Sequence, residues 1–329
     1  MQRSRIVGTG TYLPSRKVTN DDLVREFGVD TSDAWIRERT GIGARRMAAP
    51  DEATSDMAVA ASRKALEMAG ISPGDLDMIV VGTVTPDMPF PSAGSIIQAG
   101  LGARKAAAFD VSAACAGSLY ALSVADAFIR SGQMKRVLVI GAELLTRISD
   151  WKDRNTCVLF GDAAGAMVVV PETRQDRGIL STHLYTDGTT ADILKIPGGG
   201  SRKPFSPEVW EKREHLVKMN GREVFKVAVR VLDAAARDAL AHNGYQTRDV
   251  DCVIAHQANL RILDAVMKRL EIPLEKCEVN IDQVGNTSSA SVPVTLDQAN
   301  RAGKLKDGDL VLMMAIGGGM AWGSALLRW

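Results

Sequence analysis

Two stretches of the chain, ALEMAGISPGDLDMIVVG at residues 65–82 and ALAHNGYQTRDVDCVIAH at residues 239–256, align with each other without a gap. Both share Ala, Leu, Gly and two Asp at the same places, and both predict the end of a helix, a turn and an apolar strand. The same offset of 174 positions relates VLVIGA from Val137 to VLMMAI from Val311. Two matches at one offset predict an internal duplication, with an N-terminal half at residues 1–173 and a C-terminal half at residues 174–329.

Apolar runs alternate with helical patterns in both halves. The strand-like runs are DMIVVGTV, AAAFDVS, RVLVIGAE and AMVVV in the first half, then DCVIAHQ, DLVLMMAI and SALLRW in the second. This alternation is typical of α/β layering with strands that are buried on both faces. We therefore expect two sheets face to face, with helices between them and outside them. The stretch at residues 187–212, rich in Gly, Pro and charge, predicts a surface loop or lid.

Composition excludes several classes of protein. The chain has 329 residues, 46% of them hydrophobic, and a net charge of +1, which is ordinary for a soluble enzyme and gives no global signal for nucleic acid. No apolar run is long enough to cross a membrane, and the first residues lack the apolar core of a signal peptide. The four cysteines form no CxxC pair, which disfavours a metal knuckle or a disulfide framework. We expect a cytoplasmic protein with no metal, no membrane contact and no nucleic-acid partner.

Cys115 lies in FDVSAACAGSLYAL, residues 109–122, between a predicted strand and a predicted helix. Backbone amides and the helix dipole at such a turn predict a lowered thiol pKa, and the small neighbours leave room for a substrate carbonyl. The alternative is a small buried core residue, because free cysteines are among the most buried side chains. The duplication places Ser289 at the equivalent position, so the cysteine is not repeated, and this asymmetry favours a function.

Three further features follow strands or turns. His256 comes directly after a predicted strand, where α/β sheets carry catalytic groups, although a structural or surface histidine is the alternative. Asn286, in DQVGNTSSASVP, is either a turn residue or an amide donor to a substrate carbonyl. Gly317 to Gly319 follow a strand and would let backbone amides approach a substrate oxygen. This glycine run is no dinucleotide loop, because its spacing differs from GxGxxG and no helix follows it.

With these residues, the chain resembles β-ketoacyl-acyl-carrier-protein synthase III over essentially its whole length. The resemblance is carried by DVSAACAGSLYALSVAD, DRNTCVLFGDAAGA, EVFKVAV, HQANLRI, GNTSSASVP and GGGMAWGSAL. It implies the thiolase fold, an α/β architecture in which a duplicated βαβαβαββ unit forms five layers, αβαβα, and it implies a homodimer. It also implies decarboxylative condensation of a short-chain acyl-CoA, with acetyl-CoA expected, and malonyl-acyl carrier protein, which initiates fatty-acid synthesis. No cofactor is implied beyond the coenzyme A thioester that serves as substrate.

The resemblance also assigns roles to individual residues. Cys115 corresponds to the nucleophile and His256 and Asn286 to its catalytic partners, with the backbone amides of Cys115 and Gly318 as oxyanion donors. Further assignments are coenzyme A binding by Trp35, Arg39, Arg154 and Asn259; an acyl pocket bounded by Phe90 and Ile316; and carrier-protein docking by Lys226, Arg261 and Lys268.

Within these assignments, an arginine over the Trp35 indole suits a flat adenine. Phe90 would reach across the dimer and limit the length of the acyl chain. Ile316 and Ser118 stand where the family often has phenylalanine, so both are expected to reshape the acyl pocket.

The docking assignment has support from helical periodicity. Arg222, Lys226 and Arg230 recur every four residues, and Arg261 and Lys268 are seven apart, so each set shares a helix face. A basic patch would mainly raise the rate of association with an acidic partner. A solvated helix face is the alternative, since Lys and Arg are mostly exposed.

Relatives of other function remain alternatives. A thiolase would need a second reactive cysteine near the C-terminal glycines, where Met320 stands and no cysteine follows Cys277. Polyketide-type starter condensing enzymes share the catalytic triad, and acyltransferases of the same fold use oxygen or nitrogen acceptors. A non-catalytic partner that only binds acyl-CoA or carrier protein is the third alternative.

Overall fold

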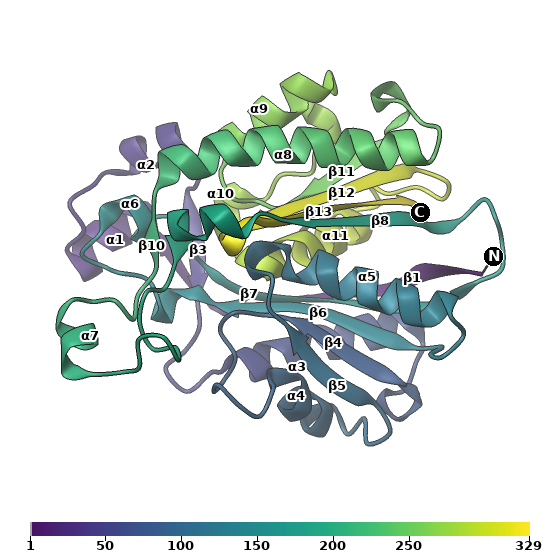
Figure 1. The fold of residues 1–329 in the computed structure, drawn as a ribbon, viewed down its shortest axis with the longest axis horizontal. Helices are drawn as coiled ribbons and strands as arrows, with labels where there is room; N and C mark the ends of the chain where they lie inside the picture. The colour runs from purple at the N-terminus through teal and green to yellow at the C-terminus, as the bar shows by residue number, and fades with distance from the viewer. Residues whose placement is uncertain (1) are drawn as a thin grey trace.

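The computed structural model describes residues 2–329 and places two β-sheets face to face (Figure 1). The first sheet has the order β1 (Arg3–Tyr12), β7 (Asp162–Glu172), β6 (Val137–Leu144), β4 (Met78–Gly82) and β5 (Ala107–Val111). The second has the order β11 (Cys252–Ala255), β12 (Leu310–Gly317), β13 (Ala321–Arg328) and β8 (Gly178–Thr186).

Within residues 2–329, the helices of nine or more residues complete the layers (Figure 1). Helices α5 (Gly117–Arg130) and α11 (Ser291–Arg301) lie between the two sheets. Helices α3 (Thr54–Ala69) and α4 (Ala93–Leu101) cover the outer face of the first sheet, and α8 (Gly221–His242) and α9 (Leu260–Leu270) cover that of the second. The predicted five-layer αβαβα architecture is confirmed.

Shorter elements gather at one end of this layered core, on the left of Figure 1. They are β2 (Arg16–Thr19), α1 (Asn20–Phe27), α2 (Asp33–Thr40), β3 (Ala44–Met47), α6 (Arg154–Cys157), α7 (Pro207–Glu211) and β10 (Lys218–Met219). The segment at residues 187–212, expected to be a loop, contains α7 and the two-residue strand β9 (Leu194–Lys195), which pairs with β10.

Equivalent elements of the two halves recur at the offset found in the sequence. Strands β4 and β11 follow helices α3 and α8, after which the equivalent glycines Gly70 and Gly244 both have positive φ. Helices α5 and α11 each begin after a single 3₁₀ turn, at Ala114–Ala116 and Ser288–Ala290. Asp77 and Asp251 even make the same backbone bonds, from their N–H groups to Arg136 O and Leu310 O. The predicted boundary at residue 173 falls between β7 and β8.

The second half departs from its copy in one strand. The counterpart of β5 is reduced to a single bridge between Val253 and Cys277, and the helix α10 (Ile281–Val284) follows. The second sheet therefore has four strands where the first has five.

Every strand expected from an apolar run is present, whereas two strands of the large sheets, β1 and β8, and the four short strands β2, β3, β9 and β10 were not predicted. The sequences of β1 and β8, RSRIVGTGTY and GILSTHLYT, mix polar residues and glycine with the apolar ones and carry no continuous apolar run. Their place is set by pairing: β1 hydrogen-bonds to β7 and β8 to β13, and each supplies only part of a buried face.

The core lies where α5 and α11 pack between the sheets. Leu119, Leu122, Val292 and Leu296 from the two helices are buried against both sheets, whose contributions include Val80, Val139, Ile254 and Met313. Helix α8 shows the complementary pattern of an outer helix, since its buried residues recur at intervals of three and four. This arrangement seals the first turns of α5 and α11 deep inside the molecule.

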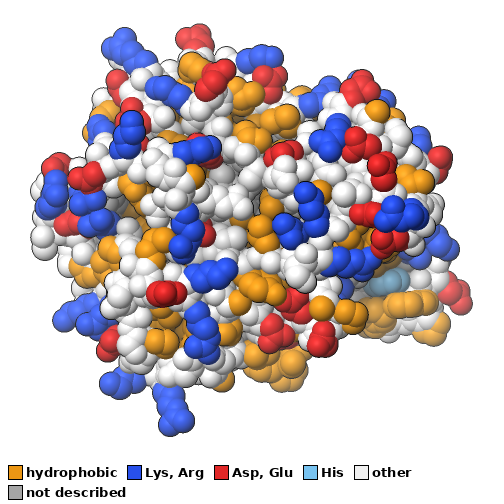
Figure 2. Space-filling view, turned by 180° about the vertical axis from the view of Figure 1, so that it is seen from behind, with side chains coloured by type: hydrophobic (Ala, Val, Ile, Leu, Met, Phe, Trp, Pro, Cys, Tyr) orange, Lys and Arg blue, Asp and Glu red, His pale blue; other side chains and the backbone are white. Residues whose placement is uncertain are grey.

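No helix within residues 2–329 combines the length and apolarity needed to cross a bilayer. On the face shown in Figure 2, Lys and Arg side chains are interspersed with Asp and Glu, as the small net charge leads one to expect.

The halves approach so closely that only glycine fits at Gly141. A Cβ atom built there would lie 2.1 Å from the carbonyl oxygen of Ser289 in the other half. We expect Gly141→Ala to lower the free energy of unfolding by about 3 kcal/mol, as overpacking against backbone does. Gly200→Ala is the matched control, because a Cβ there meets nothing within 4 Å, and its effect should stay within about 0.5 kcal/mol. Urea unfolding checks both, and equal losses would contradict this packing argument.

Candidate active site

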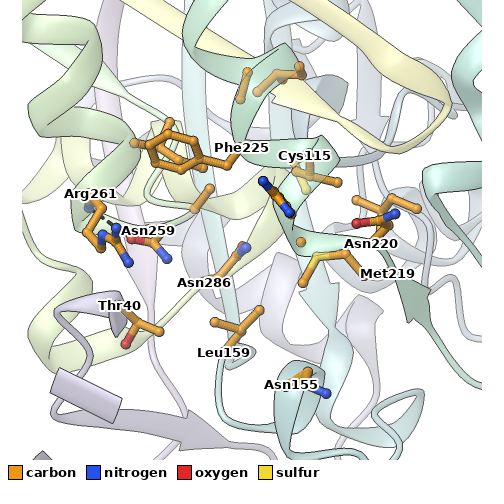
Figure 3. Close-up of a pocket in the computed structure, with 18 of the residues that line it drawn as sticks. Thr40, Cys115, Asn155, Leu159, Met219, Asn220, Phe225, Asn259, Arg261 and Asn286 are labelled. Atoms are coloured by element: carbon orange, nitrogen blue, oxygen red, sulfur yellow. Dashed lines mark hydrogen bonds between the residues drawn. The ribbon is translucent and has the colours of Figure 1, made fainter. Parts of the chain in front are cut away.

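One cavity of ≈ 980 Å³ brings together Cys115, His256 and Asn286, which are far apart in the sequence and come from both halves. Figure 3 shows Cys115 and Asn286 facing this cavity, with Asn259 at its rim. The structure thus places all three predicted catalytic side chains around a common space. Within residues 2–329, no group of three or more His, Cys, Asp or Glu side chains is arranged to hold a metal ion.

Cys115 lies in the 3₁₀ turn Ala114–Ala116 between β5 and α5, as the sequence predicted. The expected lowering of its pKa is wrong for this structure: burial raises the pKa of the Cys115 thiol to about 12. Loss of hydration is the largest cause, and the nearby Glu143 carboxyl raises the pKa further, whereas a hydrogen bond with Ser288 favours the thiolate and offsets only part of the shift. The thiol therefore becomes a nucleophile only when a bound group replaces the missing solvation.

His256 follows the last residue of β11, and its backbone N–H donates to Met314 O at 2.8 Å. Burial lowers the pKa of the imidazole from 6.5 to about 3, so the ring is neutral at physiological pH. Its Nδ1 atom is buried with no hydrogen-bond partner among the described residues. A neutral imidazole donates one N–H, so His256 is suited to hydrogen-bonding a substrate oxygen rather than to supplying a charge.

Asn286 belongs to the second half but is fastened to the first. Its backbone N–H donates to Leu159 O at 2.9 Å and its carbonyl accepts from Gly161 N at 3.0 Å. The side-chain Oδ1 accepts the N–H of Ser288 at 2.9 Å. Because the amide oxygen is occupied in this way, the NH₂ group is the part left to donate toward the cavity (Figure 3).

A buried arginine, Arg45, braces the segment that holds Asn286. Its guanidinium is 0% exposed and donates to Val158 O at 2.7 Å and to Asn20 Oδ1 at 2.8 Å. Burial lowers its pKa to about 10. Sequence reasoning missed Arg45, because one arginine in the charged run GARRM looks no different from its neighbour.

The glycine run approaches the nucleophile as expected. A Cβ on Gly317 would lie 2.4 Å from the backbone nitrogen of Cys115, so only glycine allows β12 to end there. Gly318 lines a second cavity, of ≈ 490 Å³, which also contains Cys115. Apolar side chains such as Leu145 and Ile148 form much of this second cavity.

The residues predicted to shape an acyl pocket are less uniformly placed. Ile316 lines the larger cavity. Ser118 is buried at the start of α5 and lines neither of the two cavities that contain Cys115, so any effect of its size must be indirect. Phe90 is 85% exposed and likewise lines neither cavity of the single chain.

At the mouth of the larger cavity, two arginines stack on one indole. The guanidinium carbon of Arg39 lies 4.6 Å, and that of Arg154 5.1 Å, from the centre of the Trp35 ring. Asn259 also lines the cavity, and it caps α9 by accepting from Arg261 N at 2.8 Å while donating to Arg39 O at 3.0 Å. The predicted coenzyme A residues therefore share one entrance.

Of the three predicted docking residues, Lys226 and Arg261 lie at this same mouth. Lys268 is on α9 away from the cavity lining and pairs with Asp264 at 2.7 Å. Lys226 pairs with Glu223 at 2.8 Å, so two of the three cations already have an acidic partner on their own helix.

Models of the 3-oxoacyl-[acyl-carrier-protein] synthase III family match two segments, at residues 109–188 and, for its C-terminal part, at residues 240–329. A β-ketoacyl-[acyl-carrier-protein] synthase III from Xanthomonas campestris is 53% identical over 326 residues, covering 99% of this chain and 98% of that protein. The chain belongs to this family. Another member, from Caldanaerobacter subterraneus, is 52% identical over 324 residues, with 98% and 97% of the two chains covered.

Solved structures agree with the sequence comparison. The synthase III of Aquifex aeolicus superposes with a TM-score of 0.92 at 47% identity, covering 99% of this chain and all of the other. The priming β-ketosynthase of the R1128 polyketide pathway superposes with a TM-score of 0.91 at 39% identity, covering 99% and 96%.

The depressed pKa of His256 predicts acid sensitivity of the fold. The unfolded chain takes up a proton at this residue near pH 6.5 and the folded chain only near pH 3, so the free energy of unfolding falls as pH drops below about 6.5. The slope is at most about 1.4 kcal/mol per pH unit for this group. In His256→Asn we expect a flatter profile of urea midpoint between pH 5 and 7.5. Parallel profiles for the variant and the wild type would contradict the assignment of a neutral buried imidazole.

Proposed function

We propose that this protein is a β-ketoacyl-acyl-carrier-protein synthase III, which condenses a short-chain acyl-CoA, acetyl-CoA foremost, with malonyl-acyl carrier protein at the start of fatty-acid synthesis. The observation that carries the proposal is the convergence of Cys115, His256 and Asn286 on one cavity, within a chain about half identical to named synthases.

The first half-reaction is acyl transfer to Cys115. The sulfur attacks the thioester carbonyl of acyl-CoA, an oxyanion forms, and coenzyme A leaves with the proton that the thiol gives up. The backbone N–H groups of Cys115 and Gly318 are the proposed oxyanion donors. Since burial holds the thiol pKa near 12, these donors must supply the stabilisation that water does not.

The second half-reaction is decarboxylation of the malonyl group. His256 and Asn286 donate hydrogen bonds to the malonyl thioester carbonyl, and as CO₂ leaves, negative charge grows on that oxygen. The resulting enolate carbon attacks the carbonyl carbon of the acyl-Cys115 thioester, the C–S bond breaks, and β-ketoacyl-carrier protein forms. The released Cys115 thiolate takes up a proton from solvent, which regenerates the thiol. Two neutral donors in a buried site suit this step. Burial keeps the His256 imidazole uncharged, and the low dielectric strengthens its hydrogen bond to the oxygen on which charge develops.

The mouth of the cavity provides the binding surfaces. The adenine of coenzyme A would insert at Trp35 by separating the Arg154 stack, with Arg39 beside it and Asn259 against the pantetheine arm. Lys226 and Arg261 at the same mouth, extended by Lys268 along α9, would attract an acidic carrier protein.

Two further parts of the proposal concern assembly and setting. A homodimer would bring the exposed Phe90 of one copy to the acyl pocket of the other, where it would limit chain length. The four cysteines, none of them in a disulfide, support a reducing, cytoplasmic setting. The chemistry requires no metal and no cofactor besides the coenzyme A thioester.

A polyketide starter condensation is the second candidate, favoured by the likeness to the R1128 priming ketosynthase over 99% of the chain. It shares every catalytic step above and differs in the starter acyl group and the carrier protein. Labelling with a panel of acyl-CoAs of increasing length, followed by intact mass, separates the two, because a fatty-acid initiator should react fastest with acetyl-CoA.

Mutation of the triad should separate the two half-reactions. Cys115→Ser is expected to lose all acetyl uptake from acetyl-CoA, while Cys252→Ser, a buried cysteine outside the cavity, keeps it. His256→Ala and Asn286→Ala should still take up one acetyl group but lose malonyl decarboxylation by about 10²-fold or more. Intact mass and CO₂ release measure the two steps. Full condensation in all three cavity variants would refute the proposed function.

Removal of the Trp35 indole should weaken only the binding of the nucleotide part of coenzyme A. Trp35→Ala is expected to raise KM for acetyl-CoA about tenfold with kcat nearly unchanged. With an acetyl-pantetheine thioester, which has no adenine, the variant and the wild type should be alike. Arg37→Ala is the matched control, because Arg37 lies on the same helix but pairs with Asp33. An unchanged KM for acetyl-CoA would contradict the adenine site at Trp35.

A further inference from the structure

The catalytic steps leave one buried acid beside the site unused. Glu143, near the end of β6, is 0% exposed, and among the described residues it has no ion pair. Its Oε2 atom accepts from Thr85 Oγ1 at 2.7 Å and Val84 N at 3.2 Å, and its Oε1 atom accepts from the hydroxyls of Ser288 and Ser289, both at 3.0 Å. A carboxyl group in this buried position needs these hydrogen-bond donors, since burying a polar group without partners lowers the stability of the fold.

The internal duplication shows which part of the first half corresponds to the surroundings of Glu143. At the offset of 174 positions, Ser289 is the counterpart of Cys115, Gly82 that of His256, and Glu143 that of Gly317. The Ser289 hydroxyl lies 2.6 Å from Gly82 O as well as 3.0 Å from Glu143 Oε1. In the active site, Gly317 has no side chain and leaves space beside Cys115. At the equivalent place beside Ser289, the Glu143 side chain occupies that space.

Ser288 connects Glu143 to the active site. It holds a backbone φ of +50°, a left-handed conformation that is strained for a residue other than glycine. In that conformation its N–H reaches Asn286 Oδ1 at 2.9 Å, while its hydroxyl is tied to Glu143. The same residue therefore carries strain, the bond to the acid and the bond that orients the catalytic amide.

We propose that Glu143 is a positioning residue, which holds the strained turn at Ser288 and so directs the NH₂ group of Asn286 at the malonyl carbonyl. The inference rests on the proposed function, in which Asn286 stabilises the enolate. If the bond between Glu143 and Ser288 is lost, the turn relaxes, the Ser288 N–H leaves Oδ1, and the amide is free to rotate away from its productive orientation. Acyl transfer, which does not use Asn286, should still reach completion.

Two neighbouring serines offer a matched pair for the test. Ser288→Ala and Ser289→Ala each remove one buried hydroxyl at the same 3.0 Å distance from Glu143 Oε1. Only Ser288 carries the N–H that orients Asn286. With malonyl-CoA as the probe and no starter present, we expect Ser288→Ala to lower kcat for decarboxylation about tenfold with KM within twofold. Ser289→Ala should stay within twofold in both constants, and Glu143→Ala, which removes the acceptor of the Ser288 hydroxyl, should resemble Ser288→Ala.

A double-mutant cycle separates positioning from general destabilisation. In an Asn286→Ala background, Ser288→Ala should cause no further loss of the residual decarboxylation, because the group that it positions is absent. Complete uptake of one acetyl group at Cys115 in each single variant shows that the fold is intact. Uptake is read at the end point and not as a rate, because Ser288 also hydrogen-bonds the Cys115 thiol. The inference is overturned if Ser288→Ala and Ser289→Ala lose decarboxylation equally, or if Ser288→Ala costs the same factor with and without Asn286.

The same experiment distinguishes this inference from the proposed function. A wild-type protein that takes up acetyl and decarboxylates malonyl-CoA, with Ser288→Ala unaffected, overturns the inference alone. A wild-type protein that does neither overturns both.

Discussion

The structure depends on the close contact between two turns, Ala114–Ala116 and Ser288–Ala290, at the starts of the two central helices. Each turn contains a residue with positive φ at the equivalent position, Ala114 at +44° and Ser288 at +50°. The strands that face the turns carry glycine at the contact, Gly141 within β6 and Gly317 at the end of β12, because a Cβ at either position would lie within 2.4 Å of a backbone atom. The packing of the two halves therefore fixes the nucleophile on one side and the amide-bearing segment on the other.

Desolvation is the chemical consequence of that contact. It raises the pKa of Cys115 and lowers the pKa of His256, so both groups are neutral at rest. A site of this kind lowers the barrier through preorganised hydrogen-bond donors rather than through standing charge, and a low-dielectric surrounding makes each donor more effective. Arg39, Lys226 and Arg261, which line the larger cavity, stand at its mouth, where they remain exposed and can meet an anionic substrate or partner.

The duplication explains how one site arose where symmetry would give two. The first turn carries Cys115 beside Gly317, which leaves a cavity, and the second carries Ser289 beside Glu143, which fills it. Asn286 is next in sequence to the turn that contains Ser289, but its side chain faces the cavity at Cys115. Its backbone hydrogen-bonds to Leu159 and Gly161 of the first half. Loss of one strand in the second sheet is a further departure from symmetry, and it precedes the α10 segment that leads to Asn286.

The sequence by itself determined the layered α/β fold, because apolar periodicity and a constant offset report local structure and duplication directly. It also indicated Cys115, His256 and Asn286, since each follows a strand or turn where such groups can act. Only the tertiary structure decided the thiol pKa, because a helix N-terminus is visible in sequence whereas the depth of burial is not. For the same reason Arg45 and Glu143 were not singled out in the sequence: whether a charged residue is exposed or buried is decided only by tertiary packing. Strands β1 and β8 were also decided by tertiary pairing, since their own residues lack the apolar run that marks a buried strand.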